Sequence, residues 1–327
     1  MRRKKYPVHL PPYKVEKLKG LRLLKELSNW AFNHWKIKKI WEKTQGVEVK
    51  VAVLDTGRPE HDDIKIEKSV DFTGEGEIDR SGHATWVCGC IAATKGFLGL
   101  APKCKLYTAK ILDNEGVGAW QWMKKGLEWA FAEGCQVVNI SAGGEYAGNE
   151  IQPILKKMAD LGVLIFCAAG NSGNLLIFPA VDPNTIAIGA VNEEWQKAEF
   201  SNFGPRLIAM APGVDLLGCW LNNGYCKATG TSMASPETAG VVVLERELRS
   251  TNLKEAVAKF AVTCKDMGEE GWDPLTGWGI VDPFKFLGIE ESGKKITWNW
   301  LIALFFFLLF YFFGVPAAAI KKIIKGG

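Results

Sequence analysis

The stretch VKVAVLDTG, residues 49–57, has the pattern of a short buried strand that stops at a carboxylate and a glycine. Apart from Lys50, the six residues before Asp55 are apolar and rich in valine, which is typical of a strand covered on both faces. Asp55, Thr56 and Gly57 then supply turn chemistry. A strand of this kind belongs inside a parallel sheet, so the stretch predicts an α/β fold.

Apolar, β-branched runs recur along the chain, and longer segments with helical spacing separate several of them. The predicted strands are Val47–Leu54, Cys135–Ile140, Val163–Cys167, Thr185–Val191 and Leu207–Met210, and the predicted helices include Trp120–Ala132 and Ile151–Leu161. Strands that alternate with helices require crossover connections, which build a mainly parallel sheet with helices on both faces. We therefore predict one three-layer α/β unit over about residues 46–287.

Polar groups follow three of these strands. Asp55 ends the first, VVNISAGG (137–144) ends with Ser141, Ala142 and Gly143, and VLIFCAAGNSGN (163–174) carries Asn171 between glycines. The carboxyl ends of parallel strands meet at one edge of a sheet, and ligands bind there. We expect the chemistry of the protein at this edge.

The stretch GTSMASPETAG, residues 230–240, places Ser232 at the mouth of an apolar helix among small residues. A serine hydroxyl is a poor nucleophile without a base, and histidine is the usual base near neutral pH. Of the four histidines, His9 and His34 lie in the basic N-terminal part and His61 lies in the loop RPEHDDI. His83 remains, at the start of a predicted helix.

These residues could together hydrolyse an acyl bond. Asp55 would orient His83, His83 would take the proton of Ser232, and the Asn171 amide with the Ser232 N–H would stabilise the oxyanion. Each residue also has a plainer interpretation: Asp55 and Asn171 suit turns, and His83 suits a structural position at a helix start. The combination is far more specific than its parts.

Four ordered blocks, VAVLDTG, SGHATWV, AAGN and GTSMASP, make the chain similar to the subtilisin family of serine endopeptidases. LGLAPKCKLYTAKIL, FSNFGP and TGWGIVDP support the resemblance, which covers about residues 28–285. It implies an Asp55, His83 and Ser232 triad, with Asn171 as oxyanion donor. It also implies that Ser141, Ala142 and Gly143 form the strand edge that pairs with an extended peptide substrate. The bond before Pro179 is a candidate for the cis form.

The chain departs from the family pattern at positions outside the triad. Ala84, Trp86 and Glu237 stand where the family usually has glycine, histidine and histidine. The segment AATKGFLGLAP is shorter than the common calcium-binding loop of the family, so we do not carry a calcium site over to this chain. No Cys/His cluster has zinc-ligand spacing, since Cys88 and Cys90 lack a second close pair. We thus assign no metal or other cofactor, while calcium binding stays open.

Residues 1–27 form a basic extension ahead of a predicted peptidase domain at 28–287. Residues 1–45 hold 13 Lys and Arg against 3 Glu, while the chain carries a net charge of +4, so the remainder is acidic. HLPPYKVEKL (9–18) resembles the short leader of intracellular subtilisins, and we predict that His9–Tyr13 blocks the cleft until it is cleaved. A disordered basic tail, or one that binds anionic lipid, is the alternative. We expect no nucleic-acid partner.

A linker (288–295), a hydrophobic segment (296–315) and a basic tail (316–327) end the sequence. ITWNWLIALFFFLLFYFFGV has twenty residues without charge, with lysines on both sides, which predicts a single membrane-spanning helix. A terminal core helix is the alternative. The N-terminus lacks the pattern of a signal peptide, and eight cysteines suit free thiols, so we expect the domain on the cytoplasmic side. Cys219 and Cys226 could still pair across a hairpin.

Three functions compete at this point. The first is a membrane-anchored serine endopeptidase of the subtilisin type that processes its own N-terminal extension. The second is an inactive protein of the same fold that binds peptides or partners at the membrane. The third is a basic protein of the membrane surface that acts through residues 1–45 and the C-terminal segment. The complete set Asp55, His83, Asn171 and Ser232 favours the first, whose partner is a protein or peptide substrate, while the oligomeric state stays open.

Overall fold

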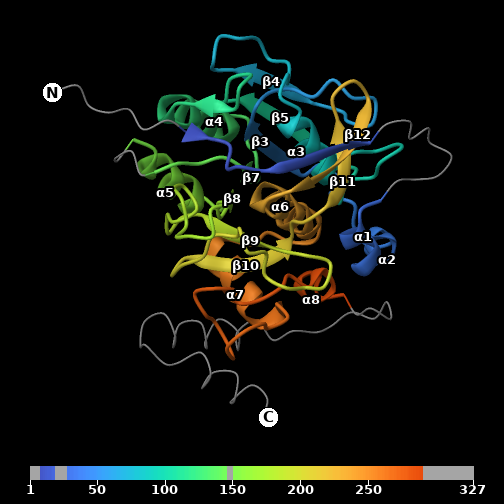
Figure 1. The fold of residues 1–327 in the computed structure, drawn as a ribbon, viewed down its shortest axis with the longest axis vertical. Coiled ribbons are helices and arrows are strands. Elements are labelled where there is room, and N and C mark those ends of the chain that lie inside the picture. The colour runs from blue at the N-terminus through green and yellow to red at the C-terminus, as the bar shows by residue number, and fades with distance from the viewer. Residues whose placement is uncertain (1–7, 19–27, 146–149, 290–327) are drawn as a thin grey trace.

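A seven-stranded sheet forms the centre of the structure, a computed structural model that describes residues 8–18, 28–145 and 150–289. Its order is β10-β9-β8-β7-β3-β5-β4, and every neighbouring pair is parallel, so the sheet runs from β4 at the top of Figure 1 to β10. The strands are β3 (Lys50–Asp55), β4 (Lys68–Asp71), β5 (Lys105–Lys110), β7 (Val137–Ile140), β8 (Leu164–Ala168), β9 (Ile186–Val191) and β10 (Leu207–Pro212).

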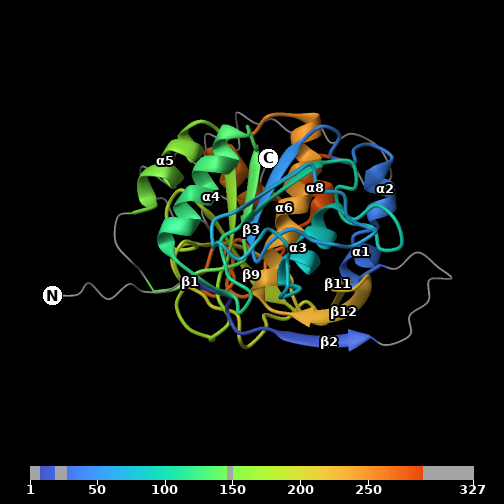
Figure 2. The ribbon, with the colours of Figure 1, turned by 90° about the horizontal axis from the view of Figure 1, so that it is seen from above.

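Helices cover both faces of this sheet, which confirms the predicted layers. On one face lie α4 (Trp120–Ala132) and α5 (Gln152–Asp160), and on the other lie α3 (His83–Ala92) and α6 (Thr231–Leu248), as Figure 2 shows. Four further helices join the core on the α3 and α6 side: α1 (Trp30–His34), α2 (Ile37–Trp41), α7 (Leu253–Thr263) and α8 (Pro283–Leu287). The two apolar cores thus cover both faces of the sheet, while the edge strand β4 stays partly exposed.

The predicted strands and helices lie where the apolar runs placed them, with ends shifted by up to three residues. The sequence pattern did not predict β5, because lysines begin and end this strand. Lys110 is nevertheless fully buried, and its Nζ donates to the carbonyl of Thr56 (2.6 Å). Burial lowers the pKa of Lys110. The peptide bond between Phe178 and Pro179 is cis, as expected.

Two small sheets lie at the edge of the large one. The hairpin of β11 (Leu216–Trp220) and β12 (Gly224–Thr229) pairs with β2 (Lys14–Leu18), and β1 (Val8–His9) pairs with β6 (Val117–Gly118); all these pairs are antiparallel. The predicted hairpin at Cys219 and Cys226 is confirmed, and the disulfide that the sequence pattern leaves open is not present there. Cys219 lies opposite Tyr225 and Cys226 opposite Gly218, and all eight cysteines are free thiols.

The described residues contain no helix that is long and apolar enough to cross a membrane. The predicted membrane segment at 296–315, the basic tail at 316–327 and most of the linker at 288–295 lie outside the described residues.

A buried glutamate joins α6 to the N-terminal side of the domain. Glu237 is fully buried, and its Oε1 accepts a hydrogen bond from Nδ2 of Asn29 (2.8 Å). The Oδ1 atom of Asn29 in turn accepts from the backbone N–H of Phe32 and caps α1. Among the described residues, Glu237 Oε2 has no hydrogen-bond partner. Desolvation by burial raises the pKa of Glu237 to about 8.

Replacing Glu237 by glutamine is predicted to stabilise the protein increasingly as the pH rises. The folded-state pKa lies above the unfolded one, so the wild type loses stability from about pH 4.5 up to about pH 8, where the curve levels. Glutamine keeps the acceptor for Asn29 and does not ionise. In urea unfolding, the free energy of unfolding of Glu237→Gln should exceed that of the wild type by a small amount at pH 5. This difference should grow to a few kcal/mol at most by pH 8, because one pKa unit corresponds to about 1.4 kcal/mol. A difference independent of pH would contradict this explanation.

Candidate active site

His83 and Asp55 form a buried pair at the carboxyl edge of the sheet. Nδ1 of His83 lies 2.8 Å and 3.0 Å from the two carboxylate oxygens of Asp55, and both side chains are buried. Asp55 is the last residue of β3 and His83 the first of α3. A hydrogen bond at Nδ1 leaves Nε2 of His83 as the atom that can accept a proton.

The start of α3 is fixed by Asp79, a buried carboxylate that the sequence reading did not single out. Asp79 accepts hydrogen bonds from the backbone N–H groups of Ser81, Gly82 and Thr85 and from two hydroxyls. The hydroxyls belong to Thr56 and Thr85. Thr56 also donates its N–H to Asp55 (2.8 Å), so one network fixes both members of the pair.

Gly82 allows the chain to turn into α3 at this point. Its φ is +91°, and a Cβ atom there would lie 2.6 Å from the ring of Trp220. Only glycine accepts this backbone without strain. The SGH sequence therefore has a direct role in placing His83.

Ser232 lies in the first turn of α6, but its hydroxyl points to the sheet edge. Oγ of Ser232 donates to the carbonyl oxygen of Ser141 (3.1 Å), and Oγ of Ser141 donates back to the carbonyl of Ser232 (3.0 Å). Asn139 links the two segments, since it donates to Ser141 Oγ and accepts from Ser235 Oγ. Among the described residues, no hydrogen-bond partner lies on Nε2 of His83. Ser232 and His83 are thus close to the same edge but not hydrogen-bonded.

Asn171 presents its amide N–H groups at the same place. Its Oδ1 accepts from both the backbone N–H (2.8 Å) and the hydroxyl (2.7 Å) of Thr231. These two hydrogen bonds from Thr231 fix which end of the Asn171 amide faces the site. The Nδ2 atom therefore faces the site as a hydrogen-bond donor, which an oxyanion requires.

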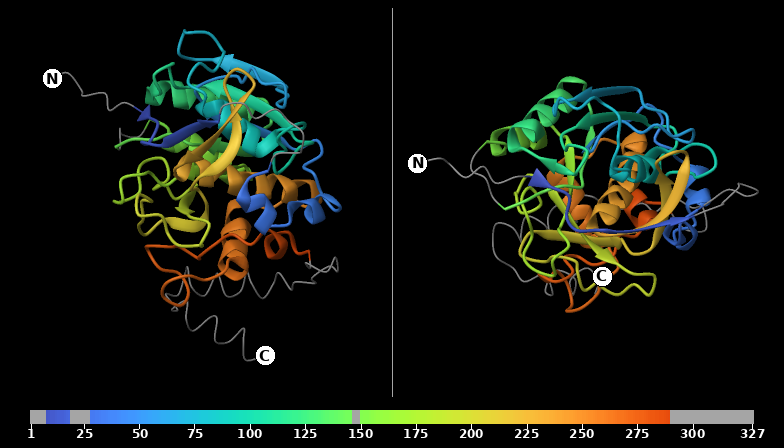
Figure 3. Two further views of the ribbon diagram at one scale, coloured as in Figure 1. Left: turned by 45° about the vertical axis from the view of Figure 1, so that its right-hand side comes forward. Right: turned by 45° about the horizontal axis from the view of Figure 1, so that its top comes forward.

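The N-terminal segment 8–18 already occupies this site. The backbone N–H and C=O of His9 both bond to Gly143, and the N–H of Leu10 bonds to Gly116. Farther along, the carbonyl oxygen of Pro12 accepts from Asn171 Nδ2 (2.8 Å). Figure 3 shows the segment running past the catalytic edge to the β11–β12 hairpin. The chain therefore binds its own N-terminal segment as an added strand.

Tyr13 covers the histidine. Its ring packs edge-on against the ring of His83, with centroids 4.8 Å apart. The Tyr13 phenol has a hydrogen bond to the Ser81 side chain, and burial is the main reason that its pKa is raised. Of the predicted substrate-edge residues, Gly143 contacts the segment directly, while Ser141 and Ala142 lie on the same edge.

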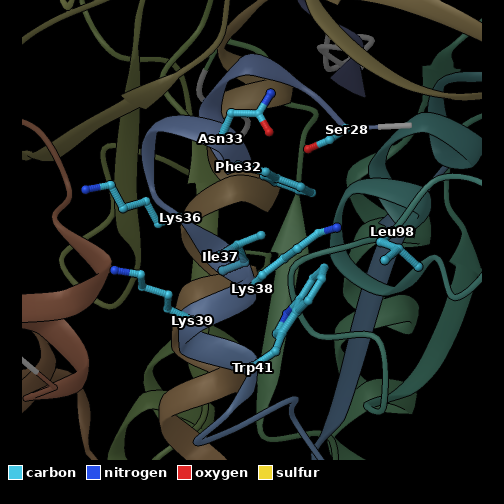
Figure 4. Close-up of a pocket in the computed structure, with 9 residues that line it drawn as sticks. All are labelled: Ser28, Phe32, Asn33, Lys36, Ile37, Lys38, Lys39, Trp41 and Leu98. Carbon is cyan, nitrogen blue, oxygen red and sulfur yellow. The ribbon is translucent and has the colours of Figure 1, made fainter. Parts of the chain in front are cut away.

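Two other places in the described structure have features of a site: a cluster of residue types that can ligate a metal, and a surface hollow. His61, Asp63 and Cys219 gather in the described structure, yet Asp63 accepts from two backbone N–H groups and the Tyr225 hydroxyl, and His61 bonds to the Gly224 carbonyl. This arrangement fixes the hairpin. The other is a hollow beside α1 and α2, where Lys36, Lys38 and Lys39 surround apolar side chains (Figure 4).

Comparison with known proteins identifies the family. The sequence profile of the subtilase family, Peptidase_S8, matches residues 46–279, which is most of the chain and contains all four site residues. The chain belongs to the subtilase family. It is accordingly a serine endopeptidase, and its substrates are proteins or peptides.

Curated subtilases are similar over the same region. Subtilisin DY of Bacillus licheniformis and subtilisin E of Bacillus subtilis (strain 168) are each 38% identical over 211 residues, or 61% of this chain. That alignment covers 77% of the first and 55% of the second. The minor extracellular protease Epr of Bacillus subtilis (strain 168) is 33% identical over 265 residues, which is 77% of this chain and 40% of that protein.

Thr231 is predicted to act as a positioning residue for Asn171. Thr231→Val removes the hydroxyl that bonds to Asn171 Oδ1 and keeps the shape of the side chain. We expect kcat on a peptide to fall about tenfold with KM changed less than about twofold, because the oxyanion donor acts mainly in the transition state. Thr231→Ser, which keeps the hydroxyl, should recover most of the loss. Equal loss in both variants would show that packing, not the hydrogen bond, is what matters.

Proposed function

We propose that the protein is a subtilase whose N-terminal segment 8–18 keeps it latent, and whose triad is Asp55, His83 and Ser232. After release of the segment, Ser232 Oγ attacks the substrate carbonyl carbon and its proton passes to Nε2 of His83. Asp55 holds the imidazole and stabilises its charged form. Asn171 Nδ2 donates to the oxyanion. His83 then protonates the leaving amine, and water hydrolyses the acyl-enzyme in the second half of the reaction.

The contact between the Pro12 carbonyl and Asn171 Nδ2 carries this proposal. A substrate carbonyl under attack has to reach the same donor, so segment and substrate compete for one position. Tyr13 on the ring of His83 adds to the block. The alternative of an inactive peptide-binding protein gains no support, because all four chemical groups are present in one place.

The two prolines of the segment are the reason that we expect it to resist cleavage. His9 pairs with Gly143 in an antiparallel bridge, and this register, continued by two residues, places Pro11 opposite Ser141. Proline has no backbone N–H and cannot donate to the Ser141 carbonyl. The Ser232 hydroxyl takes that acceptor instead, and its proton is directed away from His83. The segment thereby binds like a substrate while the nucleophile stays misaligned.

Labelling with a fluorophosphonate tests the assignment of Ser232 and the latency together. We expect slow labelling of the intact chain, and about tenfold or faster labelling after cleavage within residues 19–27 and loss of the segment. Intact mass should show one adduct. Ser232→Ala should take no adduct, whereas Ser250→Ala, a change at an exposed serine beyond the end of α6, should still be labelled. A folded, cleaved protein that takes no adduct would contradict the proposal.

A double variant sharpens this experiment. Pro11→Ala/Pro12→Ala gives residue 11 a backbone N–H that would face the Ser141 carbonyl, and it should free Ser232, so that labelling of the intact chain rises on the order of tenfold, the effect of about 1.4 kcal/mol. Cleavage between residues 12 and 13 should accompany it. The same variant with Ser232→Ala is the control for cleavage by a contaminant.

We also propose that residues 296–315 anchor the protein in a membrane with the peptidase domain on the cytoplasmic side. The uncharged apolar segment supports the anchor, the lysines around the α1–α2 hollow suit an anionic surface, and the eight free thiols suit a reducing compartment. The full chain should stay in the membrane pellet after alkaline carbonate extraction, and deletion of 296–315 should release it. External protease should spare the domain in intact cells. Release of the full chain by carbonate would refute the anchor.

A further inference from the structure

The feature that leads beyond the catalytic site is the outer edge of β12. On one side β12 pairs with β11, and on the other side five of its six residues pair with β2 of the N-terminal segment (Figure 2). The register joins five consecutive positions, from Lys14 opposite Thr229 to Leu18 opposite Tyr225. Release of the segment leaves five residues of β12 with an unpaired backbone edge, and such an edge pairs with another extended chain.

The position of Pro12 shows which part of a substrate reaches this edge. The Pro12 carbonyl lies at the oxyanion donor, so Pro12 stands for the residue whose carbonyl is attacked and Tyr13 for the residue that follows. Residues 14–18 then stand for the second to the sixth residue after the cleaved bond. β12 is therefore on the leaving-group side of the reaction.

The edge is connected rigidly to the catalytic groups. β12 ends at Thr229, and Ser232 follows in the first turn of α6. β11 packs against α3, which carries His83, and Tyr225 and Cys226 of β12 are buried. A strand that binds along β12 is consequently delivered in a fixed register to Ser232 and His83.

Side chains give this edge a chemical preference at two positions. Val15, opposite Ala228, packs against the apolar core. Glu16, opposite Lys227, is exposed, and so is Lys227, so opposite charges face each other across the pair. Cross-strand pairs of this kind contribute to strand pairing. Glu193, Glu194 and Asp215 line the hollow that also contains Lys227, and their charges weaken the attraction of Lys227 for an acidic residue.

We propose that the β12 edge is an extended binding site for the five residues from the second to the sixth after the cleaved bond, with an apolar third residue and an acidic fourth residue preferred. This inference rests on the proposed function. It identifies the substrates as flexible protein segments that can add a strand, in preference to short peptides. Backbone hydrogen bonds to β12 would supply most of the affinity for the substrate, and Lys227 would favour an acidic residue at the fourth position.

The test compares two peptides with the same sequence before the cleaved bond and the same first residue after it. The short peptide ends at that residue, and the long peptide continues to the sixth residue after the bond. The protein is the full chain in detergent, cleaved within residues 19–27. We expect kcat/KM to be at least tenfold higher for the longer peptide. The Ser232→Ala form, cleaved by an added protease, should bind the longer peptide at least tenfold more tightly by fluorescence anisotropy.

N-methylation of the third or the fourth residue after the bond gives a matched pair of controls, since successive N–H groups of a strand point to opposite sides. One of the two peptides should lose the tenfold gain and the other should keep it. A glutamate at the fourth position should be preferred over lysine about threefold, and Lys227→Glu should reverse that order. Equal cleavage and binding of long and short peptides would overturn the β12 site while leaving the protease function intact. Failure to cleave either peptide would overturn both.

Discussion

A serine hydroxyl has one proton, and in this structure the proton of Ser232 is given to the carbonyl of Ser141. The other features of the site are arranged around that fact. Asp55 is hydrogen-bonded to Nδ1 of His83, and Thr231 orients the Asn171 amide. The hydrogen bond between Ser232 and His83 is the contact that this state lacks, and the N-terminal segment occupies the Asn171 donor that we propose for the substrate carbonyl.

The fold explains why this control can be so local. The parallel sheet brings Asp55, Ser141 and Asn171 to one edge from three strands, and the two central helices bring His83 and Ser232 to it from the other side. In the function that we propose, backbone contacts decide both inhibition and turnover. The edges at Gly143 and β12 that hold residues 8–18 would then bind a substrate in extended conformation, and the proposed inhibitor and a substrate would differ mainly in whether they offer an N–H at Ser141.

Much of this could be read from the sequence, because it depended on local patterns. Apolar runs located five strands of the sheet, and the order of Asp55, His83, Asn171 and Ser232 located the site. Asp79 and Thr231 were missed because their roles arise only in three dimensions: a carboxylate that collects backbone N–H groups has no spacing signature. Whether Cys219 and Cys226 pair could not be decided from the sequence, because the hairpin was predicted without its register and a shift of one residue separates the two sulfurs.

The most direct test of the account is a crystal structure of the full chain in detergent after cleavage within residues 19–27 and loss of the segment. We predict that Ser232 Oγ leaves Ser141 and lies within hydrogen-bond distance, about 3 Å, of His83 Nε2. Asp55 and Asn171 should stay where they are, because their partners are internal to the domain. If the emptied site still shows Ser232 Oγ on the Ser141 carbonyl, the segment does not control the nucleophile and the central claim is wrong.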